Sequence, residues 1–254
     1  MNQNKIFPLF LLFVLTFSLS SFAQDMNPEA GKFYNEGNSQ LKAGNYNGAV
    51  ANYDKALGIE KDYRIYYQKG VAQKKSNDLN GSKASLQECI KLKNDFEPGY
   101  NALGGVYFSM GNYNEAITQF EKVLTLTKDA SITKKVKKNL SLAYTKLGND
   151  AISNGNPQKA VEYLNKAVEN DNYDAAYLSL AKLYSELGEW DKSISASESA
   201  LKYKSKITSG GPYFYMGVSY KGKGDTQKAK EMFEKAKQDA TYRKTAEYEL
   251  TLLN

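Results

Sequence analysis

Apolar and small residues recur along this chain in a pattern about fourteen residues long. The segments GNYNGAVANYDKAL (44–57) and GNYNEAITQFEKVL (111–124) are nearly identical, although their starts lie 67 residues apart. Four related segments occupy positions 77–90, 155–168, 188–201 and 224–237. Successive segments therefore begin 33, 34, 44, 33 and 36 residues apart. A repeat of that length indicates a solenoid built of similar units.

Two positions of the segment, seven residues apart, hold small side chains and so share one face of a helix. The sixth position is always Ala or Ser, and the thirteenth is Ala, Cys or Val. The tenth position lies between them and is large in five segments, where it is Tyr53, Leu86, Phe120, Leu164 or Phe233; Ser197 replaces it in the remaining segment. We expect a second helix to approach the small residues closely. The Gly that opens most segments suits a turn with positive φ at a helix C-terminus.

A second helical pattern precedes each segment. In 97–110, Tyr100, Leu103, Gly104 and Tyr107 follow the three- and four-residue spacing of a helix face. Each unit is therefore predicted to be a helix, a tight turn and a helix. Asn27, followed by Pro28 and Glu29, is a good helix start. Residues 241–254 are predicted to form a closing helix that shields the last repeat.

The first 23 residues differ from the rest. Lys5 precedes an apolar run at 6–17, and the small residues Ser21 and Ala23 follow it. This is the pattern of a secretory signal peptide cleaved after Ala23. The run is too short to cross about 30 Å of hydrocarbon, which argues against the alternative of an uncleaved anchor. The junction resembles export signals of Bacteroidota-type bacteria. We expect an exported protein of the periplasm or outer membrane, or a secreted one.

Composition argues against catalysis. The chain of 254 residues has no His and one Cys, so it lacks the usual general base, the commonest metal ligand and any internal disulfide. Cys89 falls in a small-residue column and is predicted to be a buried structural thiol. No phosphate-binding loop or metal-ligand spacing is present. We expect no enzymatic activity, no cofactor and no metal, and nucleic acid is not an expected partner.

The repeat resembles the tetratricopeptide repeat family. The third unit carries its pattern at Tyr100, Leu103, Gly104, Tyr107, Ala116 and Phe120, although the usual closing Pro is absent. The resemblance implies an all-α solenoid of about six helix-turn-helix repeats whose first helices line a concave groove that binds peptides or partner proteins. The expected division is a lead-in at 24–29, repeats one to three at 30–130, repeats four to six at 131–240 and the capping helix at 241–254.

The same resemblance places particular first-helix residues in the groove. They are Tyr34, Asn38, Leu41, Lys42, Arg64, Tyr67, Val71, Lys74, Lys75, Asn101 and Phe108 in repeats one to three, with Phe214, Val218 and Lys221 in repeat six. The alternative is that these side chains only cover the seams between repeats. The carboxylate clamp of chaperone-binding members is not expected, because its positions hold Tyr34, Asn38, Gln68, Pro98 and Ala102, of which only Asn38 agrees.

The single irregular spacing adds about ten residues within 131–148. There Ile132, Val136, Leu140, Ala143 and Leu147 form a continuous apolar stripe, so the first helix of repeat four is predicted to be longer by nearly three turns. Lys134, Lys135, Lys137 and Lys138 lie off this stripe. They indicate a basic docking ridge that binds either an acidic partner or an anionic envelope surface. The alternative is a solvated helix face without a binding role.

Overall fold

The structure is a computed structural model that describes residues 26–253. The predicted signal peptide lies outside the described residues. The described part is all-helical and forms six helix pairs followed by one further helix. The helices are α1 (Pro28–Lys42), α2 (Tyr46–Ile59), α3 (Tyr63–Lys75), α4 (Leu79–Leu92), α5 (Glu97–Ser109), α6 (Tyr113–Leu126), α7 (Ala130–Ser153), α8 (Pro157–Asn170), α9 (Asp174–Glu186), α10 (Trp190–Lys202), α11 (Gly210–Gly222), α12 (Thr226–Ala236) and α13 (Arg243–Thr251).

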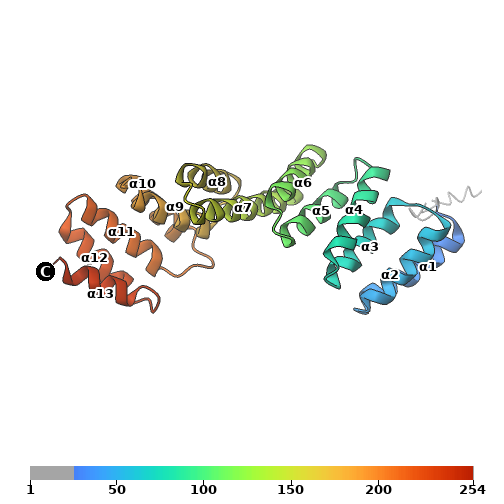
Figure 1. Ribbon diagram of the computed structural model, residues 1–254, viewed down its shortest axis with the longest axis horizontal. Helices are drawn as coiled ribbons and strands as arrows, with labels where there is room; N and C mark the ends of the chain where they lie inside the picture. Colours follow the sequence, from blue (N-terminus) through green and yellow to red (C-terminus); the bar gives the residue numbers. More distant parts are fainter. Residues whose placement is uncertain (1–25, 254) are drawn as a thin grey trace, which may run out of the picture.

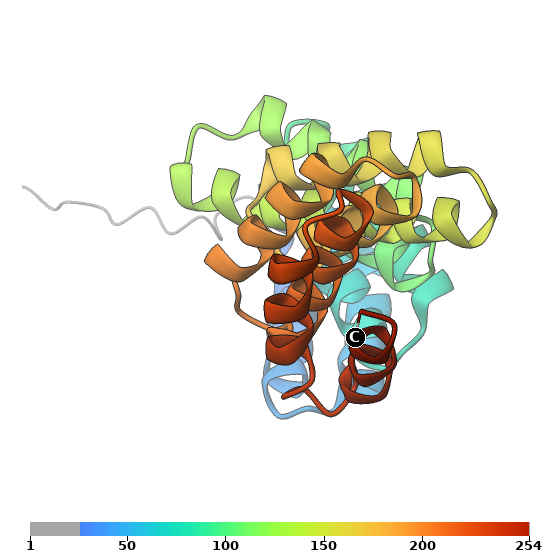
Figure 2. The same cartoon turned by 90° about the vertical axis from the view of Figure 1, so that its left-hand side faces the viewer.

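The pairs stack in chain order into an elongated array (Figure 1). Seen from the C-terminal end, successive pairs are turned relative to one another, so the array is a superhelix (Figure 2). This confirms the predicted solenoid of about six helix-turn-helix repeats with a closing helix. The turn inside each pair has a residue with positive φ, as the sequence predicted. Gly111 has φ +80°, and Asn77, which replaces Gly in repeat two, has φ +65°.

Local signals in the sequence set the helix starts. Asn27 begins α1 by accepting hydrogen bonds from the backbone N–H groups of Glu29 at 2.9 Å and Ala30 at 3.4 Å. Asp129 does the same for α7, accepting from Ser131 at 2.6 Å and Ile132 at 3.2 Å. These side chains satisfy N–H groups that have no partner within the helix.

The two helices of a repeat meet where a small residue faces a large one. The sixth and thirteenth positions of every fourteen-residue segment are fully buried. A Cβ added to Gly37 of α1 would lie 2.5 Å from Cε1 of Tyr53, and one added to Gly217 of α11 would lie 2.6 Å from Cε1 of Phe233. In repeat five Ala181 replaces the glycine and Ser197 the large residue, and both are buried. Where the second helix lacks a large side chain at the seam, the first helix thus carries Ala in place of Gly.

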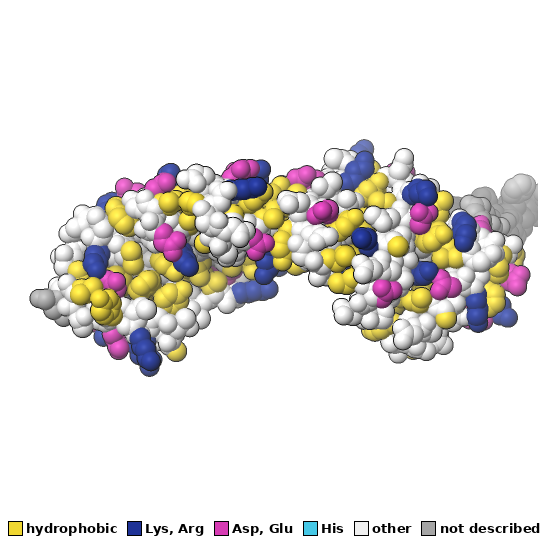
Figure 3. Space-filling view, viewed as in Figure 1, with side chains coloured by type: hydrophobic (Ala, Val, Ile, Leu, Met, Phe, Trp, Pro, Cys, Tyr) yellow, Lys and Arg dark blue, Asp and Glu magenta, His cyan; other side chains and the backbone are white. Residues whose placement is uncertain are grey.

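The long helix α7 joins the two halves of the array. It has 24 residues, whereas α3, α5, α9 and α11 have 13 each, as the extra spacing predicted. Its first half places Val136 and Leu140 in a buried cluster with Phe120 of α6. Its last turns place Ala151 in a second cluster with Leu164 and Leu180. In the space-filling view the outline narrows over α7 (Figure 3).

The closing helix α13 covers the last repeat. Ala246 of α13 is fully buried with Phe233 and Ala236, and Tyr242, Leu250 and Leu253 pack against the same cluster. The predicted closing helix within 241–254 is therefore present and packs on the last repeat. The cap shields an apolar surface that a seventh repeat would otherwise cover.

A buried carboxylate that sequence analysis missed holds the connection between α10 and α11. Oδ2 of Asp174, at the start of α9, accepts hydrogen bonds from the backbone N–H groups of Ser205 and Lys206, both at 2.6 Å, and of Ile207 at 3.2 Å. Burial alone would raise the pKa of Asp174, but these donors outweigh it and hold the pKa below its ordinary value. Asp174 therefore fixes this longer connection against α9.

Candidate functional site

A pocket of about 620 Å³ opens between α3, α5 and α7. Helix α3 contributes Val71, Lys74 and Lys75 to its wall, and α5 contributes Asn101 and Phe108. The third wall is α7, with Asn139 and Leu142. Its volume lies within the range of about 300–1,000 Å³ that is usual for ligand pockets.

The structure brings together one part of the predicted groove. Val71, Lys74, Lys75, Asn101 and Phe108 all line the pocket. They come from repeats two and three, which fold side by side through the α3, α4 and α5 contacts. Their presence in one hollow makes this the candidate binding site.

Lys74 reaches from α3 to the backbone of α5 within the pocket. A Cβ added to Gly105 of α5 would be 2.8 Å from its Nζ atom, so the absence of a side chain at Gly105 lets the ammonium lie against the helix backbone. Although part of Lys74 is open to solvent, burial of its ammonium among neighbouring atoms lowers its pKa from the ordinary value. The pocket therefore holds a partly desolvated cation.

Two carboxamides and an aromatic ring complete the wall. Asn101 is exposed and Asn139 is half-buried, and within residues 26–253 neither side chain has a hydrogen-bond partner. The Phe108 ring is held edge-on against Tyr113, with ring centroids 5.3 Å apart. The pocket thus offers unused donors and acceptors next to an apolar surface.

The predicted groove residues of repeat one lie outside the pocket, and three of them pack within their own repeat. Tyr34 has its ring 6.1 Å from that of the buried Tyr53. Asn38 accepts a hydrogen bond of 2.8 Å from the Tyr53 hydroxyl through Oδ1. Leu41 packs against the same core cluster, whereas Lys42 is exposed. The side chains of Tyr34, Asn38 and Leu41 therefore lie along the seam between α1 and α2.

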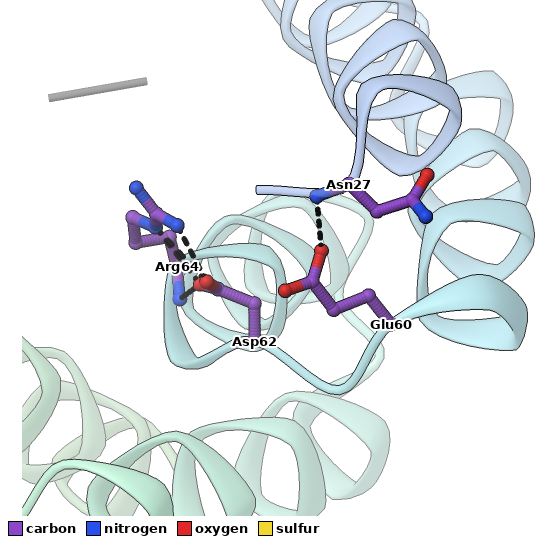
Figure 4. A network of polar contacts seen from close by, with 4 residues as sticks. All are labelled: Asn27, Glu60, Asp62 and Arg64. Atoms are coloured by element: carbon purple, nitrogen blue, oxygen red, sulfur yellow. Dashed lines mark hydrogen bonds and ion pairs between the residues drawn. The ribbon is translucent and has the colours of Figure 1, made fainter. Parts of the chain in front are cut away.

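Arg64 and Tyr67 of α3 also lie outside the pocket. Arg64 pairs with Asp62, with Nη2 2.6 Å from Oδ2, beside the contact in which the backbone N–H of Asn27 donates to Glu60 (Figure 4). Tyr67 sets its ring edge-on to Phe96 at 5.3 Å and packs against a buried cluster that includes Leu86. Tyr67 thus joins repeats two and three, whereas the Arg64 pair with Asp62 lies at the start of α3.

The candidate residues of repeat six face the capping helix. Phe214 packs against Phe233 at 5.7 Å and against Tyr242, which precedes α13, at 5.5 Å between ring centroids. Val218 packs against the same cluster. Lys221 is paired with Glu249 of α13, with Nζ 2.6 Å from Oε2. This end of the first-helix face is occupied by the chain itself.

The four lysines of α7 are exposed, as predicted, but they do not share one direction. Lys135 precedes Asn139 by one helical turn, and Lys138 precedes Leu142 by one turn, so both extend from the side of α7 that forms the pocket wall. Lys137 is two residues beyond Lys135 and therefore about 200° round the helix. Lys134 lies one turn before Lys138 and about 140° round the helix from Asn139, so it extends between these two directions.

Sequence analysis missed the contribution of α7 to the pocket. Asn139 and Leu142 fall between members of the apolar stripe and were assigned no role, and Gly105 was not recognised as the seat of the Lys74 ammonium. The signal that could have found the wall was the irregular spacing itself, because it adds turns to the start of α7, which follows repeat three directly in the chain.

Residues 26–253 hold no reactive thiol, no metal-binding cluster and no membrane-spanning helix. Cys89 is buried, and burial raises the pKa of its thiol to about 12, which leaves it protonated and unreactive. No three His, Cys, Asp or Glu side chains in this part of the chain gather where they could hold a metal ion. None of the described helices combines the length and apolarity needed to cross a bilayer.

Models of the tetratricopeptide repeat match residues 33–63, 63–96, 99–172, 145–212 and 213–240. No sequence among the curated proteins matches this chain significantly. Among solved structures, MamA is 27% identical, with a TM-score of 0.50, and the match covers 73% of this chain and 94% of MamA.

Two further solved structures resemble the fold. YrrB, described as a tetratricopeptide repeat protein with an unusual peptide-binding site, is 22% identical, with a TM-score of 0.51 over 77% of this chain and 96% of YrrB. A double mutant of MamA is 19% identical, with a TM-score of 0.53 over 70% of this chain and 96% of the other. With matches of the repeat models from residue 33 to residue 240, this chain belongs to the tetratricopeptide repeat family.

Proposed function

We propose that this protein is a non-enzymatic scaffold that binds an extended segment of a partner protein in the pocket between α3, α5 and α7. The observation that supports this is the pairing of apolar and unused polar groups in one hollow. Phe108, Val71 and Leu142 offer an apolar surface, while Asn101 and Asn139 have carboxamides with no partner in the described chain.

The chemistry of these groups suits a peptide backbone. A carboxamide presents a donor and an acceptor side by side, which is the complement of a peptide group. A segment bound in extended form leaves its backbone polar groups unpaired, so they need such partners when they enter a pocket. The ring of Phe108 gives an alternate side chain of the segment a place to be buried.

The proposal is tested with an unbiased library of linear peptides displayed on phage. Peptides selected on the full chain are measured by fluorescence anisotropy against Asn101→Ala and, as a matched control, Asn114→Ala, which removes an exposed Asn from the second helix α6. We expect Asn101→Ala to weaken binding about tenfold, as for a central contact residue, and Asn114→Ala to leave it unchanged. Equal effects of the two variants, or no selected peptide at all, would reject the pocket as the binding site.

We further propose that the protein works after export, in the periplasm or at the outer membrane. The support is the sequence pattern at 1–23, with its charged start, apolar run and small residues before position 24.

A second candidate function is binding to an anionic envelope polymer or membrane surface through α7. The observation that favours it is that Lys134, Lys135, Lys137 and Lys138 are all exposed, and none has an ion-pair partner within residues 26–253. Binding of this kind weakens steeply as salt rises, because the contacts are charges at the surface.

A further inference from the structure

Building on the proposed function, we propose that the bound segment is acidic: an apolar side chain with Asp or Glu on both sides of it. Lys74 and Lys75 on α3 and Lys135 on α7 would form one composite site with the pocket. The groove and the basic part of α7, which sequence analysis treated as alternatives, would then be two walls of the same surface.

The charge of the pocket supports an acidic occupant. Lys74 and Lys75 line it, and no Asp or Glu is among the described residues that do so. Neither lysine has a carboxylate partner within residues 26–253; Lys75 has its Nζ atom 5.8 Å from the ring centroid of Tyr46. Some lysines elsewhere in the array are paired, as Lys69 is with Asp54 at 2.6 Å. The two cations of the pocket are left for a ligand.

The extension of α7 adds a cation on the opposite wall. Lys135 lies one turn before Asn139 on the same face of α7. Side chains of a helix lean toward its N-terminus, so the Asn139 carboxamide and the Lys135 stem lie over neighbouring patches of the wall. Lys135 is not itself among the lining residues, but the added turns of repeat four place its positive charge within one helical turn of the pocket wall.

The placement of the cations fits side-chain carboxylates spread along a segment. Lys74 and Lys75 come from α3 and Lys135 from α7, with α5 between these two helices in the array (Figure 1). Phe108 of α5 lines the same pocket. An apolar residue seated on Phe108 would therefore direct its neighbours on either side toward lysines. A single terminal carboxylate would engage only one wall.

The test uses three short synthetic peptides with amidated C-termini and fluorescein at the N-terminus. Each has a central Phe, flanked on both sides by Glu, by the near-isosteric Gln or by Lys. Fluorescence anisotropy with the full chain gives the dissociation constants at low and high salt. We expect the Glu peptide to bind about tenfold more tightly than the Gln peptide at low salt and the Lys peptide not to bind, with the difference shrinking at high salt.

Two substitutions on α7 separate a composite site from general attraction. Lys135→Gln and Lys137→Gln remove the same charge from the same helix, two residues apart, and Gln has nearly the helix propensity of Lys. We expect Lys135→Gln to weaken the Glu peptide at least threefold, Lys74→Gln to do the same, and Lys137→Gln to have little effect. Circular dichroism checks that each variant keeps its helicity.

The possible outcomes are distinct. Equal binding of the Glu and Gln peptides, or equal effects of Lys135→Gln and Lys137→Gln, would overturn the acidic composite site but leave peptide binding in place. Polyglutamate, which lacks Phe, is a further control. If it binds as tightly as the Glu peptide, the surface is a simple polyanion site and the acidic composite site is overturned. If library-selected peptides bind and the Glu peptide does not, the acidic preference is wrong; if neither binds, the proposed function fails as well.

Discussion

Gly104 of α5 lies directly against the ring of Phe120 in α6: a Cβ on Gly104 would be 2.6 Å from Cε1. The next residue, Gly105, faces the other way, and a Cβ there would meet only the Nζ atom of Lys74, at 2.8 Å. Two adjacent glycines therefore serve different purposes. The first closes the seam between the helices of repeat three, and the second makes room for the Lys74 ammonium in the pocket.

This difference predicts opposite effects of the same substitution. Gly104→Ala forces its methyl group against a buried ring and should lower the free energy of unfolding by about 1–3 kcal/mol. Gly105→Ala displaces only the end of a flexible side chain and should raise it by up to about 1 kcal/mol, since Ala favours a helix interior. Urea denaturation followed by circular dichroism measures both. Changes of the same sign would contradict the seam described here.

Two buried serines give a second matched pair. The Ser82 hydroxyl donates to the carbonyl of Gly70 at 2.6 Å, whereas the buried Ser197 hydroxyl has no partner among the described residues. Ser82→Ala should therefore cost about 1 kcal/mol of stability. Ser197→Ala should be neutral or stabilising, because it removes an unpaired polar atom. A larger loss from Ser197→Ala than from Ser82→Ala would show that the two hydroxyls are not placed as described.

Asp174 should make the free energy of unfolding depend on pH in the acidic range. Its folded-state pKa lies below the ordinary value, so its contribution is fully present above the unfolded-state pKa of about 3.9 and is lost as the pH falls through the folded-state pKa. Asp174→Asn should destabilise the protein by about 1–3 kcal/mol at neutral pH, because two short hydrogen bonds to a charged acceptor are weakened. Below pH of about 4 the gap between the variant and the natural protein should narrow.

The control for this measurement is Asp95→Asn. Asp95 is exposed, and its ion pair with Lys93 is long, with Nζ 3.6 Å from Oδ1. Asp95→Asn should therefore change the free energy of unfolding by less than about 0.5 kcal/mol at any pH. A constant gap between Asp174→Asn and the natural protein from neutral to acid pH would argue against a carboxylate that is ionised at this site.

Export is tested on the protein itself. The pattern at 1–23 predicts cleavage between Ala23 and Gln24. N-terminal sequencing of the protein recovered from the cell envelope should begin at Gln24. A chain that begins at Met1 in that fraction would contradict cleavage at this point.

The repeat architecture could be predicted from sequence because the helices of every unit pack through small and large residues at the same positions. The small residues of the sixth and thirteenth columns, such as Ala116 and Val123, are fully buried, and the period of the pattern gave the helix pairs. The long α7 followed from one irregular spacing. Local patterns of this kind suffice because each repeat packs mainly on its neighbours.

The pocket was only half predictable. Val71, Lys74 and Phe108 occupy first-helix positions shared by the repeats, so the resemblance indicated them. Asn139 belongs to the extra turns of α7, which have no counterpart in the other repeats, and its position depends on how α7 packs against α6. Asp174 was missed because its partners are backbone N–H groups about thirty residues away, which no sequence pattern marks.

The central claim is that the pocket between α3, α5 and α7 is the binding site, and side-chain amide NMR tests it most directly. A peptide selected from the library is titrated into the isotope-labelled chain, and the NH₂ signals of Asn101, Asn139 and Asn114 are followed. The account predicts that the signals of Asn101 and Asn139 shift together, with one dissociation constant, while that of Asn114 stays in place. A saturable shift at Asn114 with none at Asn101 and Asn139 would contradict it.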